Sequence, residues 1–287
     1  MIDTHTHLDG EEFKDDILET IERASIAGIN EVYLPAIDLQ SCHGVIDMAK
    51  RINSMPYGVK AYTMLGIHPE EVRTDWQEQL SKIKEIIDSN LAGGQDCRQA
   101  GGIIAIGEVG LDYYWSREFE HEQLEAFERQ VQWSIETRLP LMIHCRKAQN
   151  EMVRMLRPYA KDLPGGVFHC FTGNEHEAEE LLEFDRFVLG IGGVLTFKKS
   201  NLPETLAHAV PLDRIVLETD SPYMAPVPMR GKRNEPAYVA HVCNKLAEVY
   251  GVTPTEVDRI TTDTAHRVFL PHHFSLCPDE IASCVYT

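Results

Sequence analysis

Histidine and acidic residues stand at the ends of several short apolar runs in this sequence. Leu-Met-Ile-His and Val-Phe-His are two such runs, and the residues concerned are His5, His7, Glu108, His144, His169 and Asp220. Burying an imidazole or a carboxylate at such a position costs free energy unless the group is paired or coordinated. A divalent metal ion would supply that partner, so the pattern indicates a metal site.

The spacing of His5 and His7 favours chelation. In a strand, residues i and i+2 point to the same side, so the two imidazoles face one side and Thr6 faces the other. Glu218 and Asp220 share this parity, which places Glu218 one layer deeper. Six ligand-type groups exceed the three protein ligands that a single catalytic zinc usually takes. Two metals bridged by a carboxylate would use them all.

Each of these residues has a plainer interpretation when taken alone. A single histidine at a strand end is often a hydrogen-bonded core residue, and Glu108 could pair with an arginine. Asp220 precedes Ser221 and Pro222, a pattern that is typical of a helix N-cap. The metal interpretation is favoured because five expected strand ends carry such residues, whereas those near residues 35 and 191 do not. We expect His68 to contact substrate or support the ligands, because the set is complete without it.

Short β-branched runs alternate with stretches of helical period. We expect strands at residues 2–5, 31–35, 60–67, 103–106, 141–144, 166–169, 187–191 and 214–218. We expect helices at residues 13–27, 41–52, 77–90, 119–137, 150–159, 175–183, 203–209, 237–250 and 254–269. Eight such units fit an α/β fold of the (β/α)₈ TIM-barrel type, somewhat distorted, with the metal site at the C-terminal mouth of the strands. A doubly wound open sheet is the alternative, but no G-x-G-x-x-G follows the first strand.

The domain organisation follows from this pattern. We expect residues 1–270 to form a single barrel and residues 271–287 to form an irregular C-terminal tail. The glycine-rich stretch 91–102 is predicted to be a surface loop on the face opposite the catalytic mouth.

The composition is that of an acidic protein, with 27 Lys and Arg against 45 Asp and Glu and a net charge of −18. This balance argues against a nucleic-acid scaffold, although bound cations can reverse the sign locally. No run of about 18 apolar residues predicts a membrane span, and the N-terminus does not resemble a secretory signal. The seven cysteines are scattered, which indicates a reducing compartment and hence a cytoplasmic location. The sequence leaves the oligomeric state open.

Cationic side chains follow three of the expected strands. Arg146 follows the fifth strand, Lys199 the seventh, and Arg233 lies in the Pro- and Gly-rich loop after the eighth. Each could be a solubilising surface charge. Gathered around a metal mouth, they suit a phosphate-bearing substrate. We therefore predict that Arg146, Lys199 and Arg233, together with His68, bind substrate.

Six stretches of the chain, in order over residues 1 to about 270, match a known family. They are Ile2-Asp-Thr-His-Thr-His-Leu-Asp9, Gly66-Ile-His-Pro69, Ile106-Gly-Glu-Val-Gly-Leu-Asp-Tyr-Tyr114, Leu141-Met-Ile-His-Cys-Arg-Lys-Ala148, Phe168-His-Cys-Phe-Thr-Gly173, and Leu217-Glu-Thr-Asp-Ser-Pro-Tyr223 with Arg230-Gly-Lys-Arg-Asn-Glu-Pro236. The chain resembles the TatD family of metal-dependent deoxyribonucleases, within the amidohydrolase-like barrels. It departs from the family pattern at Lys147, at Met229, in the loop 91–102 and in the tail.

The resemblance implies a 3′–5′ exonuclease that cleaves phosphodiester bonds with a water molecule activated by two metals. The implied ligands are His5 and His7 with Asp220 for one metal, and His144 and His169 for a second metal, bridged to the first by Glu108. Asp220 would also accept the proton of the attacking water, so Asp220 and Glu108 are the expected catalytic residues. The implied partner is DNA, through single-stranded ends, or another phosphodiester.

The donor set bears on the metal. Imidazole with carboxylate suits Zn²⁺, Mn²⁺, Fe²⁺, Co²⁺ or Ni²⁺, whereas Mg²⁺ prefers oxygen ligands. We expect two divalent cations, with Zn²⁺ as the occupant in a structure and Mg²⁺ or Mn²⁺ as candidates to support activity.

Two other functions fit part of the pattern. The first is an amidohydrolase acting on a cyclic amide or lactone, but several such enzymes bridge their metals with a carboxylated lysine where this chain has Glu108. The second is a metal-stabilised binding barrel without turnover. Structural metal sites are usually closed and four-coordinate, and six ligand-type groups at an open mouth argue against one.

Overall fold

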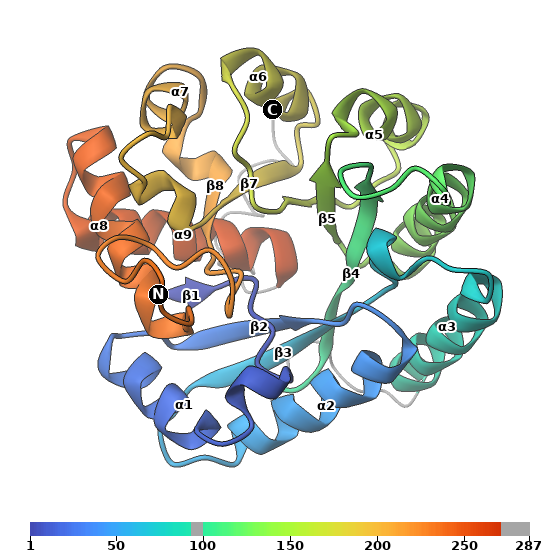
Figure 1. Ribbon diagram of the computed structural model, residues 1–287, viewed down its shortest axis with the longest axis horizontal. Helices are drawn as coiled ribbons and strands as arrows, with labels where there is room; N and C mark the ends of the chain where they lie inside the picture. The colour runs from blue at the N-terminus through green and yellow to red at the C-terminus, as the bar shows by residue number, and fades with distance from the viewer. Residues whose placement is uncertain (93–99, 271–287) are drawn as a thin grey trace, which may run out of the picture.

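The strands of this protein form one parallel sheet that is wound into a barrel (Figure 1). The computed structural model describes residues 1–92 and 100–270. The strands are β1 (Ile2–Asp3), β2 (Glu31–Pro35), β3 (Lys60–Leu65), β4 (Ile103–Asp112), β5 (Leu141–Arg146), β6 (Gly166–Phe168), β7 (Phe187–Ile191) and β8 (Ile215–Leu217), paired in that order. Backbone hydrogen bonds join the first and last strands beyond their ends, for example from Asp220 N to His5 O at 2.9 Å. The predicted TIM barrel is confirmed.

Most helices surround the strands on the outside of the ring, and the last one lies across the end of the barrel (Figure 1). In the described ranges they are α1 (Ile17–Ile26), α2 (Leu39–Asn53), α3 (Trp76–Ala92), α4 (Glu120–Thr137), α5 (Gln149–Leu156), α6 (Glu175–Leu182), α7 (Leu202–Ala209), α8 (Val239–Tyr250) and α9 (Pro254–Phe269). None of these helices is long and apolar enough to cross a membrane. The predicted tail 271–287, and residues 93–99 of the predicted loop, lie outside the described residues.

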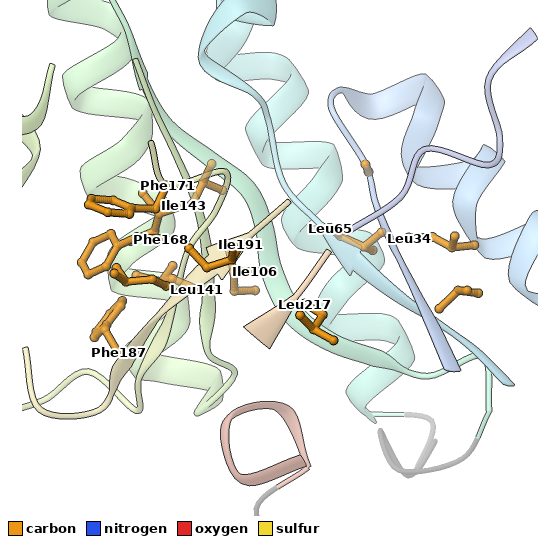
Figure 2. Close-up of a cluster of buried hydrophobic side chains, with 14 of the residues drawn as sticks. Leu34, Leu65, Ile106, Leu141, Ile143, Phe168, Phe171, Phe187, Ile191 and Leu217 are labelled. Atoms are coloured by element: carbon orange, nitrogen blue, oxygen red, sulfur yellow. The ribbon is translucent and has the colours of Figure 1, made fainter. Parts of the chain in front are cut away.

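Alternation along the strands sorts side chains between two apolar layers. Leu141 and Ile143 of β5 pack between the sheet and the helices, in the layer that Figure 2 shows. Met142 packs inside the barrel, where Phe269 of α9 and Tyr33 also meet, with their ring centroids 5.0 Å apart. Because side chains alternate, the residue two positions after Met142 also faces inward. The barrel interior is thus apolar at the level of Met142 and carries His144 nearer to the C-terminal mouth.

Strand β4 is longer than the sequence predicts, because it continues past residue 106 to Asp112. Its register against β5 shifts between Ile106 and Val109. Gly110, at φ 140°, permits this path, since a Cβ there would lie 1.9 Å from the carbonyl oxygen of His144. The sequence pattern suggests a strand that stops at the glycines, whereas the glycines let the strand pass close to β5. Glu108 therefore lies inside a strand and not after its end.

Candidate metal centre

The six predicted ligand residues meet at the mouth of the barrel. They are carried by the segments that follow β1, β6 and β8 and by strands β4 and β5 themselves; the residues are His5, His7, Glu108, His144, His169 and Asp220. Asp220 is not the N-cap of a helix, as its local sequence also allowed, because the next helical turn is Pro236–Tyr238. Thr6 points away as predicted, with its Oγ1 2.5 Å from Oγ of Ser221.

One cluster forms around His5 and His7, whose Nε2 atoms lie 3.2 Å apart. The Oε2 atom of Glu108 is 3.2 Å from Nε2 of His5 and 3.6 Å from Nε2 of His7. The Oδ1 atom of Asp220 lies 3.9 and 3.7 Å from the same two nitrogens. Ligands about 2.1 Å from a tetrahedral zinc ion stand about 3.4 Å apart. The spacing of these donor atoms therefore fits a metal ion at their centre.

A second cluster faces the other oxygen of Glu108. Its Oε1 atom is 3.1 Å from Nδ1 of His144 and 3.7 Å from Nε2 of His169. His169 Nε2 also lies 3.9 Å from Oδ1 of Asp220, and its ring stacks on that of His5 with centroids 3.7 Å apart. Each carboxylate oxygen of Glu108 thus faces its own group of imidazoles, an arrangement that suits a carboxylate shared by two cations.

His68 lies beside the second cluster, with its Nε2 atom 3.5 Å from Oε1 of Glu108. Its Nδ1 atom accepts a hydrogen bond from the backbone N–H of Glu70 at 3.1 Å. A neutral imidazole that accepts at Nδ1 carries its proton on Nε2. The ring therefore donates toward Glu108, which favours the predicted supporting or substrate-contact role over metal coordination.

Two further carboxylates lie beside the ring nitrogens that the histidines of the second cluster turn away from Glu108. Oδ2 of Asp112 is 2.9 Å from Nε2 of His144, and Oε1 of Glu218 is 3.1 Å from Nδ1 of His169. Glu218 is fully buried, in the deeper layer that its parity with Asp220 predicts. Asp112 was missed by sequence reasoning, because it lies beyond Gly107 and Gly110, where the strand was expected to have ended, and precedes the aromatic residues 113–115. Its position four residues after Glu108, at the end of the apolar run, is the signal that could have found it.

Burial and neighbouring charges set the protonation of the centre. Burial lowers the pKa of His5 well below its ordinary value and that of His7 to about 4, so both rings are neutral at pH 7. Burial would raise the pKa of Glu108, but the facing rings of His5 and His68 hold it well below its ordinary value. Neutral imidazoles beside an ionised carboxylate are the ligand states that a metal requires.

The other two histidines and Asp220 behave differently. Burial lowers the pKa of His144, but hydrogen bonds to Asp112 and Glu108 outweigh it and raise the pKa to about 9. Burial raises the pKa of the Asp220 carboxyl to about 7, and the nearby Glu108 contributes to this shift. A metal in the second cluster would thus replace a proton on His144.

The predicted cations are placed in three ways. The Arg146 guanidinium lies over the ring of Tyr114, 3.6 Å from its centroid, and Lys199 is exposed in the loop after β7. Arg233 is instead 2.6 Å from a carboxylate oxygen of Asp16, and its guanidinium lies over the ring of Phe13. Arg233 therefore fastens its loop to the start of α1. The substrate contacts expected of Arg146, Lys199 and Arg233 stay predictions.

Comparison with known proteins agrees with this geometry. The family model described as TatD related DNase matches residues 2–270. This chain belongs to the TatD family. A TatD-family chain of this kind is a metal-dependent hydrolase that acts on ester bonds, as the relatives and the ligand clusters together show.

Three relatives illustrate the similarity. The metal-dependent hydrolase YabD of Bacillus subtilis, itself uncharacterised, is 34% identical and is aligned over 94% of this chain and 98% of its own length. The 3′-5′ ssDNA/RNA exonuclease TatD of Pectobacterium atrosepticum is 30% identical, with 94% and 99% covered. The crystal structure of the TatD homologue YJJV from Escherichia coli superposes with a TM-score of 0.81 at 25% identity, covering 94% and 98% of the two chains.

Proposed function

We propose that this protein is a deoxyribonuclease of the 3′–5′ exonuclease type that uses two divalent cations. The observation that carries the proposal is the position of Glu108, each of whose oxygens faces a separate cluster of imidazoles. His5, His7 and Asp220 would hold one cation, and His144 with His169 the other. The name of the Pectobacterium relative, an exonuclease on single-stranded DNA and RNA, supports the choice of a nucleic-acid substrate.

The chain's own residues supply the rest of the chemistry. Bound divalent cations lower the pKa of a water molecule and neutralise charge on phosphoryl oxygens. Asp220 accepts the proton of the attacking water, and its carboxylate oxygen, 3.9 and 3.7 Å from the Nε2 atoms of His5 and His7, lies close enough to the first cluster for this role. His68, whose ring lies beside Glu108, and the cations Arg146, Lys199 and Arg233 are the residues we expect to orient the phosphodiester.

A cytoplasmic location forms part of the proposal. In the described ranges, Cys42, Cys145, Cys170 and Cys243 are free thiols, which suits a reducing compartment.

An activity panel tests the proposed function. Metal-free protein is supplied with Zn²⁺, Mn²⁺ or Mg²⁺ and assayed on 5′-labelled single-stranded DNA, duplex DNA, RNA, cyclic amides and lactones. We expect metal-dependent shortening of single-stranded DNA from its 3′ end. Turnover of amides or lactones, without nucleic-acid hydrolysis, would refute the proposal.

The role of Asp220 is tested in the same assay. Asp220→Asn should lower turnover under saturating metal by roughly 100-fold or more, because general acid–base groups contribute about 10² to 10⁴ in rate. Asp47→Asn is the matched control, since Asp47 is an exposed residue of α2 whose carboxylate forms a surface ion pair with Lys50. Unchanged turnover of Asp220→Asn would exclude Asp220 as the base.

A further inference from the structure

Two large aromatic side chains are exposed directly after β4. Tyr114 is 48% and Trp115 is 70% accessible, and their rings meet edge to face with centroids 4.7 Å apart. Aromatic side chains normally contribute their large apolar area to a core or an interface. A pair left in solvent beside a catalytic mouth therefore indicates recognition of a ligand.

This pair is attached to the metal centre itself. The backbone N–H of Tyr114 donates to Oδ1 of Asp112 at 2.8 Å, and the other oxygen of Asp112 holds His144. Arg146, two residues after His144, lies over both rings, 3.6 Å from the centroid of Tyr114 and 5.4 Å from that of Trp115. Its guanidinium forms no close ion pair with a carboxylate of the described residues, although its charge acts on the nearby Glu70, where it partly offsets the rise in pKa that burial causes. This cation beside the two rings suits contact with a phosphate.

A third exposed aromatic side chain lies across the mouth. Tyr223, 58% accessible, follows β8, and its ring lies edge to face with that of His7 at a centroid distance of 6.4 Å. Strands β4 and β8 are separated by three strands in a ring of eight, which places them on opposite sides of the barrel. The metal ligands thus lie between Tyr114 and Trp115 on one side and Tyr223 on the other.

We propose that Trp115, supported by Tyr114 and Arg146, and Tyr223 across the mouth stack on the bases that flank the scissile phosphate. This inference rests on the proposed function and adds that the protein binds the faces of unpaired bases, whatever their identity. Aromatic stacking tolerates any base, but it requires bases whose faces are free, as in a single strand. Stacking also explains how a chain with a net charge of −18 can hold a polyanion without a broad basic surface.

The test compares two oligonucleotides with the same backbone. Metal-loaded protein is titrated with a hydrolysis-resistant phosphorothioate oligothymidylate and with an abasic oligomer of equal length. We expect the wild type to bind oligothymidylate at least about tenfold more tightly. Trp115→Ala and Tyr223→Ala should each weaken that binding roughly 5- to 100-fold while hardly changing the affinity for the abasic oligomer.

Two further variants sharpen the test. Trp115→Phe keeps an aromatic face and should retain most of the affinity. Ile26→Ala removes an apolar side chain that is 81% exposed at the end of α1, on the opposite face of the barrel, and should leave affinity unchanged.

Different negative results would refute the stacking proposal alone or the proposed nuclease function as well. Equal affinity of the wild type for the abasic and the base-bearing oligomer would overturn the stacking proposal and leave the proposed phosphodiesterase activity intact. Unchanged affinity in Trp115→Ala and Tyr223→Ala would overturn it as well. A wild type that binds neither oligomer, and that also fails to shorten unmodified single-stranded DNA in the activity panel, would overturn the proposed function together with the stacking proposal.

Discussion

At the scale of single residues, the second cluster is defined by which nitrogen each histidine presents to Glu108. Asp112 holds Nε2 of His144, which leaves Nδ1 toward Glu108, whereas Glu218 lies at Nδ1 of His169 and leaves Nε2. A carboxylate behind a metal-binding imidazole orients the ring and raises its basicity. The two buried carboxylates therefore leave Nδ1 of His144 and Nε2 of His169 pointing toward the position of one cation.

Asp112→Asn tests this role through metal binding instead of turnover. Losing a carboxylate that supports a ligating histidine costs about 10- to 100-fold in metal affinity. We expect a loss in this range when metal-free protein is titrated with Mn²⁺ in a calorimeter. Asp47→Asn should bind Mn²⁺ like the wild type. If Asp112→Asn also binds with wild-type affinity, Asp112 does not position His144.

The sequence predicts the ligand residues better than their support. His5, His144 and His169 are recognisable because each ends an apolar run, where an unpaired imidazole would be costly. Asp112 resembles an ordinary turn residue, and its contact with His144 depends on the unexpected length of β4. The ion pair of Arg233 with Asp16 is a second contact that the sequence does not predict, because it depends on how the loop after β8 folds back. The expected contact of Arg233 with phosphate stays a prediction.

At the scale of elements, strand β7 approaches the metal centre through a glycine. A Cβ at Gly190 would lie 2.2 Å from Oε2 of Glu218. Glu218 has little freedom to yield, because it is buried and accepts a hydrogen bond from the backbone N–H of Cys170 at 2.6 Å. The absence of a side chain at position 190 of β7 thus makes room for the carboxylate of Glu218, which lies beside His169.

Gly190→Ala should therefore lower the free energy of unfolding of the metal-free protein by about 1–3 kcal/mol, the usual cost of overpacking. Urea unfolding in the presence of a chelator measures the change. Gly44→Ala is the matched control, because Gly44 lies in α2 and its added methyl meets only Asp9 at 3.3 Å. The control should stay within about 1 kcal/mol of wild type. A Gly190→Ala variant as stable as wild type would show that Glu218 can move.

The order and type of the elements were predictable, because apolar periodicity of two and of 3.6 residues alternates along the chain. Their ends were less so. Helix α5 stops at Leu156, short of the predicted residue 159, and a 3₁₀ turn at Arg157–Tyr159 follows. Pro158 accounts for this end, because proline lacks the N–H that would continue the helix.

At the scale of the whole molecule, an acidic chain gathers its functional groups at one end of the barrel. Imidazoles and carboxylates occupy the centre of the mouth, and exposed aromatic residues, with Arg146 over two of their rings, occupy its rim. The opposite end is closed by apolar packing of α9 against the strands. This division is the one that TIM barrels use, with stability at the N-terminal face and chemistry at the C-terminal face.

The central claim is that Glu108 joins two cations that act together on a phosphodiester. The most direct measurement is a titration of metal-free protein with Mn²⁺, in which bound metal and shortening of a 5′-labelled single-stranded oligonucleotide are followed in the same samples. The account predicts two Mn²⁺ ions per chain, with loss of nucleotides from the 3′ end rising as the second ion binds. Full activity with one bound ion, or two bound ions without hydrolysis, would contradict it.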